Sequence, residues 1–162
     1  RKIIYEYGEE KFAPSIARAI VRAREIKPIE TTFELSDIIK SAMPAAAKRD
    51  GHPARKTFQA IRIYINSEIS GLDNAVADMF DCLNIGGRVS VITFHSLEDR
   101  TVKKQLAEYS KGCTCPKNFP VCVCGNSPRA KVFKAVSPSA AEVAENNRSR
   151  SARLRTAEKL TD

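Results

Sequence analysis

A histidine, a serine and three charged residues follow one another where an apolar run ends. Residues 88–94 are rich in β-branched side chains and predict a buried strand. The polar residues directly after it are His95, Ser96, Glu98, Asp99 and Arg100. Ligands of open α/β sheets bind beyond the carboxyl ends of the strands, so this position favours a site.

A structural interpretation competes with that site. Ser96 with Asp99 three residues later matches a capping box, and acids in a first helical turn suit the helix dipole. Capping leaves His95 and Arg100 unexplained. His95 is therefore a candidate for hydrogen bonding or for carrying a proton near neutral pH.

Four cysteines form a second group, arranged as two C-x-C pairs. They are Cys113 and Cys115, then Cys122 and Cys124, in a loop predicted over 111–127. Four thiolates can close a tetrahedral zinc site, although the spacing is tighter than the common C-x₂₋₄-C. Reduced free thiols and a redox pair are the alternatives. Cys82 falls on an apolar helix face and is expected to be a small buried hydrophobic residue.

Arginines make up the third group, over residues 146–155. The four arginines are Arg148, Arg150, Arg153 and Arg155, and small hydroxyl residues, Ser149 and Ser151, are interleaved with them. Arginine forks and serine hydroxyls are common phosphate ligands, which suits contact with an RNA backbone. A charged edge strand that discourages strand pairing is the competing interpretation.

Charge and composition narrow the class of protein. Residues 82–162 hold 14 Lys and Arg against 7 Asp and Glu, while residues 1–81 hold 13 Lys and Arg against 12 Asp and Glu. The net positive charge therefore lies in the second half of the chain and favours a nucleic-acid partner. With 162 residues, 43% of them hydrophobic, the chain can bury a core. No apolar run approaches the roughly 18 residues of a membrane span. Five cysteines without a secretion signal indicate a reducing, cytoplasmic compartment.

Two further features concern a nucleotide cofactor. The seven glycines never fall in a G-x-G-x-x-G or G-x-x-x-x-G-K spacing, so no phosphate-binding glycine loop is encoded. The first residue is Arg rather than Met, and an amphipathic segment begins at once. We therefore expect these residues to be the later part of a longer protein.

Helical patterns dominate the first half. Apolar spacing predicts helices over 11–27 and, capped by Thr32, up to Pro44. Residues 45–56 are polar and basic, as expected for either a linker or an RNA-facing loop. Thr57 is predicted to cap a helix that continues past Gly71, with Arg62, Asn66 and Ser70 on one strip.

The second half predicts alternating elements. A helix over 97–109 after the strand at 88–94 indicates a βα unit of a parallel sheet. A strand over 130–136 and a short helix over 138–145 follow. Residues 150–160 predict an edge strand, with Leu154 on one side and Arg153 and Arg155 on the other.

Three long stretches carry a family resemblance. They are residues 52–63 with Asn66, the Gly86-Gly87-Arg88 turn leading into 94–100, and Glu145-Asn146-Asn147-Arg148-Ser149-Arg150-Ser151-Ala152. Together they closely resemble the bacterial RsmH (MraW) family, S-adenosylmethionine-dependent methyltransferases that modify the exocyclic N4 amine of a cytidine in 16S ribosomal RNA. Tyr64 and Asn147 depart from the residues frequent in that family.

The resemblance implies an α/β fold: the C-terminal half of a Rossmann-like methyltransferase sheet, with a helical insertion domain. Residues 1–55 would be the insertion and 56–162 the C-terminal part of the catalytic domain. The S-adenosylmethionine site and the principal catalytic acceptor would lie outside this chain, which is expected to be inactive alone. The implied partner is the 16S rRNA of the small ribosomal subunit, and a homo-oligomer is compatible with the sequence.

The resemblance also suggests roles for single residues. His95, Ser96 and Asp99 would line the target-base pocket, with Arg62 and Asn66 nearby. The residues expected to hold phosphates are Arg100, Arg148 and Arg150. Two other functions are compatible with the residues: a non-enzymatic RNA-binding module with a zinc knuckle of four cysteines, and an assembly role for the helical insertion.

Overall fold

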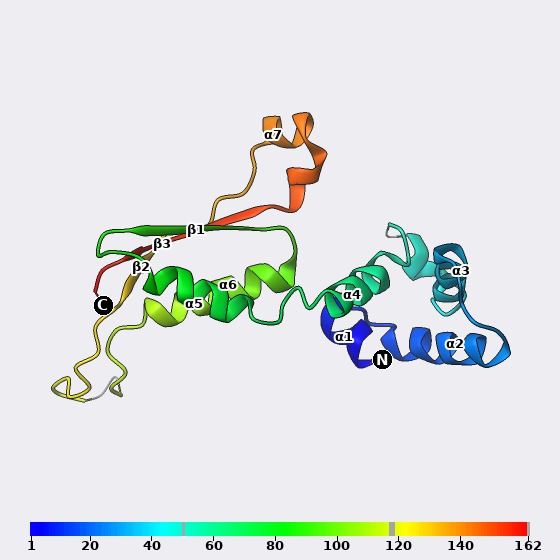
Figure 1. Cartoon of the computed structure of the whole chain (residues 1–162), viewed down its shortest axis with the longest axis horizontal. Coiled ribbons are helices and arrows are strands. Elements are labelled where there is room, and N and C mark those ends of the chain that lie inside the picture. The colour runs from blue at the N-terminus through cyan, green and yellow to red at the C-terminus, as the bar shows by residue number, and fades with distance from the viewer. Residues whose placement is uncertain (50, 117–118, 162) are drawn as a thin grey trace. The chain divides into compact units, whose positions relative to one another are not determined.

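The chain forms two compact units in a computed structural model that describes residues 1–49, 51–116 and 119–161 (Figure 1). Unit 1 is Arg1–Glu68 and unit 2 is Ile69–Asp162. The units divide 13 residues after the expected boundary at 55/56, because the helix that begins at Arg55 packs within unit 1. Residue 50 of the predicted polar stretch and residues 117 and 118 of the predicted cysteine loop lie outside the described residues.

Unit 1 is helical. Its elements are α1 (Lys2–Gly8), α2 (Ala13–Ile26), α3 (Thr32–Ser41), a 3₁₀ turn η1 (Ala45–Arg49) and α4 (Arg55–Ile65). Helices α2 and α3 confirm the predicted helices. The cap of α3 is Thr31 rather than Thr32: Thr31 Oγ1 accepts from the Glu34 amide at 3.1 Å, and Glu34 Oε2 accepts from the Thr31 amide at 3.1 Å. This reciprocal capping box satisfies two backbone donors at the helix start.

The close approach of α1 to α4 explains why α4 belongs to unit 1. A Cβ added at Gly8 would lie 2.7 Å from the Lys56 carbonyl oxygen, so only glycine fits there. Helix α4 begins at Arg55 after Ala54, and Thr57 is fully buried inside it. The predicted cap at Thr57 is therefore wrong. The core contains Ile4, Ala13, Ile16, Ile39, Met43 and Ala54.

Unit 2 is built on a three-stranded antiparallel sheet. Its strands are β1 (Arg88–Thr93), β2 (Ala130–Val132) and β3 (Arg153–Lys159), in the order β1-β3-β2. The expected edge strand over 150–160 is wrong, because β3 lies between β1 and β2. Both described neighbours of β3 are antiparallel to it, and parallel pairing of β1 stays a prediction. The register sets Thr93 opposite Arg153 and Arg88 opposite Glu158.

Two helices, α5 (Leu72–Asp81) and α6 (Ser96–Tyr109), pack on one face of this sheet (Figure 1). The shared core contains Val76, Phe80, Val89, Val102, Leu106, Ala130 and Ala157. The short helix α7 (Ala140–Glu145) and the 3₁₀ turn η2 (Asn147–Ser151) precede β3. None of the described helices has the length and apolar character needed to cross a membrane.

The helix-facing side of β3 carries charge. Ala157 lies in the core, so by strand alternation Arg155 and Lys159 share its face. Lys159 is 4% exposed, and its Nζ donates to the carbonyls of Asp81 at 3.4 Å and Leu83 at 3.0 Å. These contacts satisfy carbonyls at the end of α5. Arg155 and Lys159 therefore face inward, opposite to the predicted solvent-facing basic edge, whereas Arg153 at the start of the strand is exposed.

Candidate functional site

The corner from β1 into α6 is held by a capping box centred on His95. His95 has extended backbone angles, and its Nδ1 accepts from the Glu98 amide at 3.3 Å. Glu98 Oε2 accepts in return from the amides of Phe94 at 2.8 Å and His95 at 3.2 Å. The predicted Ser96–Asp99 box is therefore wrong, because the helix begins at Ser96 itself and the cap is one residue earlier.

Capping fixes the His95 ring. Its side chain is only 10% exposed, and its Nε2 lies 3.2 Å from Glu98 Oε1. Because Nδ1 accepts a hydrogen bond, a neutral ring carries its hydrogen on Nε2. The cap thus accounts for the residue that the sequence left unexplained. A role for His95 in proton transfer stays a prediction.

Asp99 forms a paired contact with Arg155 across the helix–sheet interface. Arg155 Nε donates to Asp99 Oδ1 at 2.7 Å and Nη2 donates to Oδ2 at 2.8 Å. Thr93 Oγ1, on a buried residue, also donates to Asp99 Oδ1 at 3.4 Å. The Arg155 hydrogen bonds hold the pKa of Asp99 below its ordinary value, despite the opposing effect of burial. Asp99 therefore ties α6 to β3.

Exposed residues surround this corner. Ser96 and Arg100 on the first turns of α6 are exposed, as is Phe94. The pairing of Thr93 with Arg153 brings the start of β3, and η2 before it, to the same end of the sheet. The structure thus gathers Ser96, Arg100 and the arginines of η2 at the carboxyl end of β1.

The η2 arginines lie on an ordered turn. Arg148 and Arg150 are both exposed. The Arg148 amide donates to Asn146 Oδ1 at 3.1 Å, and Arg150 Nη1 donates to the Asn147 carbonyl at 3.1 Å. This turn presents two guanidinium groups to solvent beside the β1–α6 corner, as a phosphate-binding segment requires.

Arg62 and Asn66 converge on an acid that the sequence did not single out. Arg62 Nε and Nη2 donate to the two Glu68 oxygens at 2.8 and 3.0 Å, and Asn66 Nδ2 donates to Oε1 at 3.3 Å. Both belong to unit 1, at the end of α4 and just after it. Their proximity to His95 stays a prediction. Ser70 of the predicted strip lies in unit 2.

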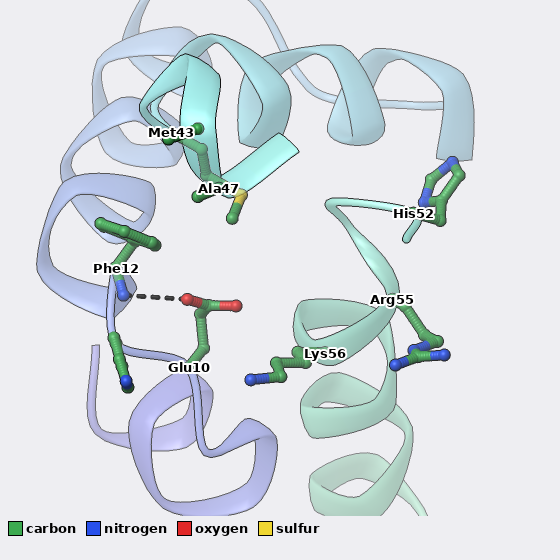
Figure 2. A pocket seen from close by; sticks show the side chains of 9 residues that line it. Glu10, Phe12, Met43, Ala47, His52, Arg55 and Lys56 are labelled. Atoms are coloured by element: carbon green, nitrogen blue, oxygen red, sulfur yellow. Dashed lines mark hydrogen bonds between the residues drawn. The ribbon is translucent and has the colours of Figure 1, made fainter. Parts of the chain in front are cut away.

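Unit 1 contains a basic cavity of about 350 Å³. Glu10 is 4% exposed there and accepts from the Phe12 amide at 2.9 Å, while Figure 2 shows Lys56 reaching from α4 towards it. The other basic residues of the lining are Lys11, His52 and Arg55. Part of the polar stretch 45–56 therefore lines a cavity, and its contact with RNA stays a prediction.

The four loop cysteines come together in space. Their Sγ atoms all lie within 4.8 Å of one another. Amide hydrogen bonds from Asn126 and Thr114 lower the pKa of Cys124 to about 5. The Cys115 amide lowers the pKa of Cys113, but hydrogen bonds among the neighbouring thiols outweigh it and raise that pKa to about 11. Cys82, expected to be buried, is exposed just after α5.

Comparison with known protein families assigns the chain to one of them. The chain belongs to the MraW methylase family, whose model matches residues 1–160. It is 56% identical to the ribosomal RNA small subunit methyltransferase H of Brevibacillus brevis, over 98% of this chain and 52% of the relative. The like-named protein of Carboxydothermus hydrogenoformans is 52% identical, over 99% of this chain and 52% of the relative. The chain thus spans about half the length of these relatives.

Proposed function

We propose that the chain is the C-terminal portion of an S-adenosylmethionine-dependent methyltransferase that methylates N4 of a cytidine in 16S rRNA. The observation that carries this proposal is the 52–56% identity, over nearly the whole chain, to relatives named as methyltransferases of small-subunit ribosomal RNA. Unit 2 would be part of a Rossmann-like sheet and unit 1 a helical insertion. The enzyme would work in the cytoplasm on the small ribosomal subunit.

The reaction requires a shaped pocket for the base. The exocyclic amine of cytosine is a weak nucleophile because its lone pair is delocalised into the ring. The enzyme must therefore hold it in line with the methyl group and accept its hydrogen bonds as it pyramidalises. The base must also leave its stack to reach the methyl donor. S-adenosylmethionine supplies the methyl group, and we assign its binding to residues outside this chain.

The geometry at the β1–α6 corner supports a different role for each of the three predicted pocket residues. Ser96 is exposed at the corner and would contact the base. His95 is bound by Glu98 and would shape the pocket wall. Asp99 has both carboxylate oxygens on Arg155, so we assign it a structural role that ties α6 to β3.

The basic groups would hold the RNA backbone. Arg100, Arg148 and Arg150 are exposed in unit 2, and the cavity of Figure 2 adds Lys56 and its basic neighbours in unit 1. Phosphate contacts of this kind position a substrate without reading its sequence. The methyltransferase names of the relatives do not favour the non-enzymatic RNA-binding module.

Removing the η2 arginines tests this assignment. In the full-length protein, Arg148→Ala/Arg150→Ala is expected to raise KM for small ribosomal subunits at least about tenfold. One lost charge-assisted hydrogen bond of about 1.5 kcal/mol corresponds to that factor. The slope of log KM against log salt should fall by about two, one for each phosphate contact. Steady-state methyl transfer at several salt concentrations measures both quantities.

A matched variant controls for charge alone. Lys103→Ala/Lys104→Ala removes two exposed cations from α6 in the same unit and should leave KM and the salt slope nearly unchanged. An equal rise in KM and an equal fall in the salt slope in both double variants would contradict a specific phosphate site at η2. A melting temperature shared with the wild type would show that the η2 turn still folds without the Arg150–Asn147 contact.

A further inference from the structure

We propose that Cys113, Cys115, Cys122 and Cys124 form a structural zinc site that closes the loop between α6 and β2. The two C-x-C pairs lie on opposite arms of residues 110–129, and their four Sγ atoms converge. A site of four thiolates leaves no open position on the ion, so it is structural rather than catalytic.

The sulfur positions fit one tetrahedral ion. Sγ of Cys113 lies 3.4 Å from that of Cys122 and 3.7 Å from that of Cys124, and Cys122 lies 3.6 Å from Cys124. Zn–S bonds of about 2.3 Å in a tetrahedron would place the sulfurs about 3.8 Å apart. The remaining separations are no larger than 4.8 Å. Small shifts of the side chains would therefore complete the coordination.

Backbone amides support the sulfurs in a reciprocal pattern. The amide of Thr114, in the middle of the first pair, donates to Cys124 Sγ of the second pair at 3.4 Å. The amide of Val123, in the middle of the second pair, donates to Cys115 Sγ of the first pair at 3.4 Å. Hydrogen bonds to ligand atoms orient them and stabilise their charge, as outer-shell groups do in metal sites.

Besides its sulfur contacts, the described part of the loop has few links between its arms, such as the hydrogen bond from Asn126 Nδ2 to Thr114 Oγ1 at 3.1 Å. Its described residues form no helix or strand, and its apolar side chains face solvent: Phe119 is 51% exposed, Val121 69% and Val123 73%. A connection this long without a core of its own needs a cross-link to be ordered. Four sulfurs in tetrahedral array select zinc or iron–sulfur chemistry, and a single central position fits one zinc ion.

Metal analysis of the full-length protein tests the site. The protein is purified under reducing conditions without chelator, and zinc and iron are measured by mass spectrometry. We expect about one zinc per chain from this site. Cys115→Ser/Cys124→Ser should lose that zinc, whereas Cys82→Ser, which changes an exposed cysteine outside the cluster, should keep it. Zinc affinity should fall by more than the roughly 100-fold that an outer-shell change costs.

Two further measurements keep the proposal falsifiable if a variant folds poorly. Cobalt added to the metal-free wild type should give the visible spectrum of a tetrahedral cobalt thiolate. Chelation should speed hydrogen exchange in residues 111–126 and leave the amides of β1 and α6 unchanged. The proposal would be overturned if the protein held no zinc before and after reconstitution, or if it held iron in place of zinc. It would also be overturned if the double cysteine variant kept its zinc. Disulfides, which lower the intact mass by two hydrogens each, would contradict it as well.

Discussion

Replacing Asp99 with asparagine is expected to lower the free energy of unfolding of unit 2 by about 2 kcal/mol at neutral pH, within the range for hydrogen bonds to charged groups. The bidentate hydrogen bonds between Arg155 and Asp99 join the first turn of α6 to the central strand β3. Arg155 and Asp99 are 15% and 24% exposed, so the variant leaves a largely buried guanidinium without its counter-charge. Hydrogen exchange at α6 amides in the full-length protein measures the local loss.

Acid should remove the same contribution from the wild type. The folded-state pKa of Asp99 is lowered, chiefly by the Arg155 hydrogen bonds, so its stabilisation is present above the unfolded-state pKa of about 3.9. That stabilisation is lost as pH falls through the folded-state value. The stability difference between wild type and Asp99→Asn should therefore shrink below about pH 4. As a control, Asp78→Asn on α5 changes an exposed acid and should alter stability by no more than about 0.5 kcal/mol at neutral pH.

The rate of methyl transfer separates a structural role of Asp99 from substrate contact. Because both Asp99 oxygens already bind Arg155, methyl transfer per folded molecule should stay close to the wild-type rate. A large fall in kcat with an unchanged melting temperature would show instead that Asp99 contacts the substrate.

Phe80→Ala is expected to have the largest effect on stability, about 3–5 kcal/mol for a buried phenylalanine. Phe80 is fully buried and stacks on Tyr109, with ring centroids 4.3 Å apart. The Arg129 guanidinium lies 5.6 Å from the Phe80 centroid and 5.4 Å from that of Tyr109. Truncation removes the ring that joins α5, α6 and the start of β2.

An exposed phenylalanine supplies the comparison. Phe33 is 83% exposed, so Phe33→Ala should change stability by no more than about 0.5 kcal/mol. Denaturant-dependent hydrogen exchange at core amides of unit 2, such as that of Leu106, reads the Phe80 effect directly. A loss below about 1 kcal/mol would contradict a well-packed core around this ring.

Apolar periodicity along neighbouring residues predicted α2, α3, α6 and β1. The helix predicted from Thr57 past Gly71 is wrong, because α4 and α5 are separate helices in different units. The cap of α6 was misplaced by one residue, since Ser96 is a better capping residue by type than His95. What decides the cap is the extended backbone of His95, which continues from β1. The position of the cap therefore depends on where β1 ends in the folded structure.

Strand order and the direction of Arg155 needed the fold. The arginines of this strand predict a charged edge strand. In the structure β3 lies between β1 and β2, and Arg155 contacts Asp99 of α6. The acid that makes this tolerable, Asp99, is 56 residues away in sequence. Pairings over such separations leave no local signal. The cysteines were easier, because two short pairs across one loop already suggested convergence.

We propose that this chain belongs to an enzyme that methylates small-subunit ribosomal RNA on cytidine N4, and one measurement tests that proposal directly. The full-length protein, methyl-labelled S-adenosylmethionine and small ribosomal subunits from cells lacking the gene provide the direct measurement. After digestion of the RNA to nucleosides, the label is predicted on N4-methylated cytidine. Label on another nucleoside, or none in the RNA, would contradict the claim.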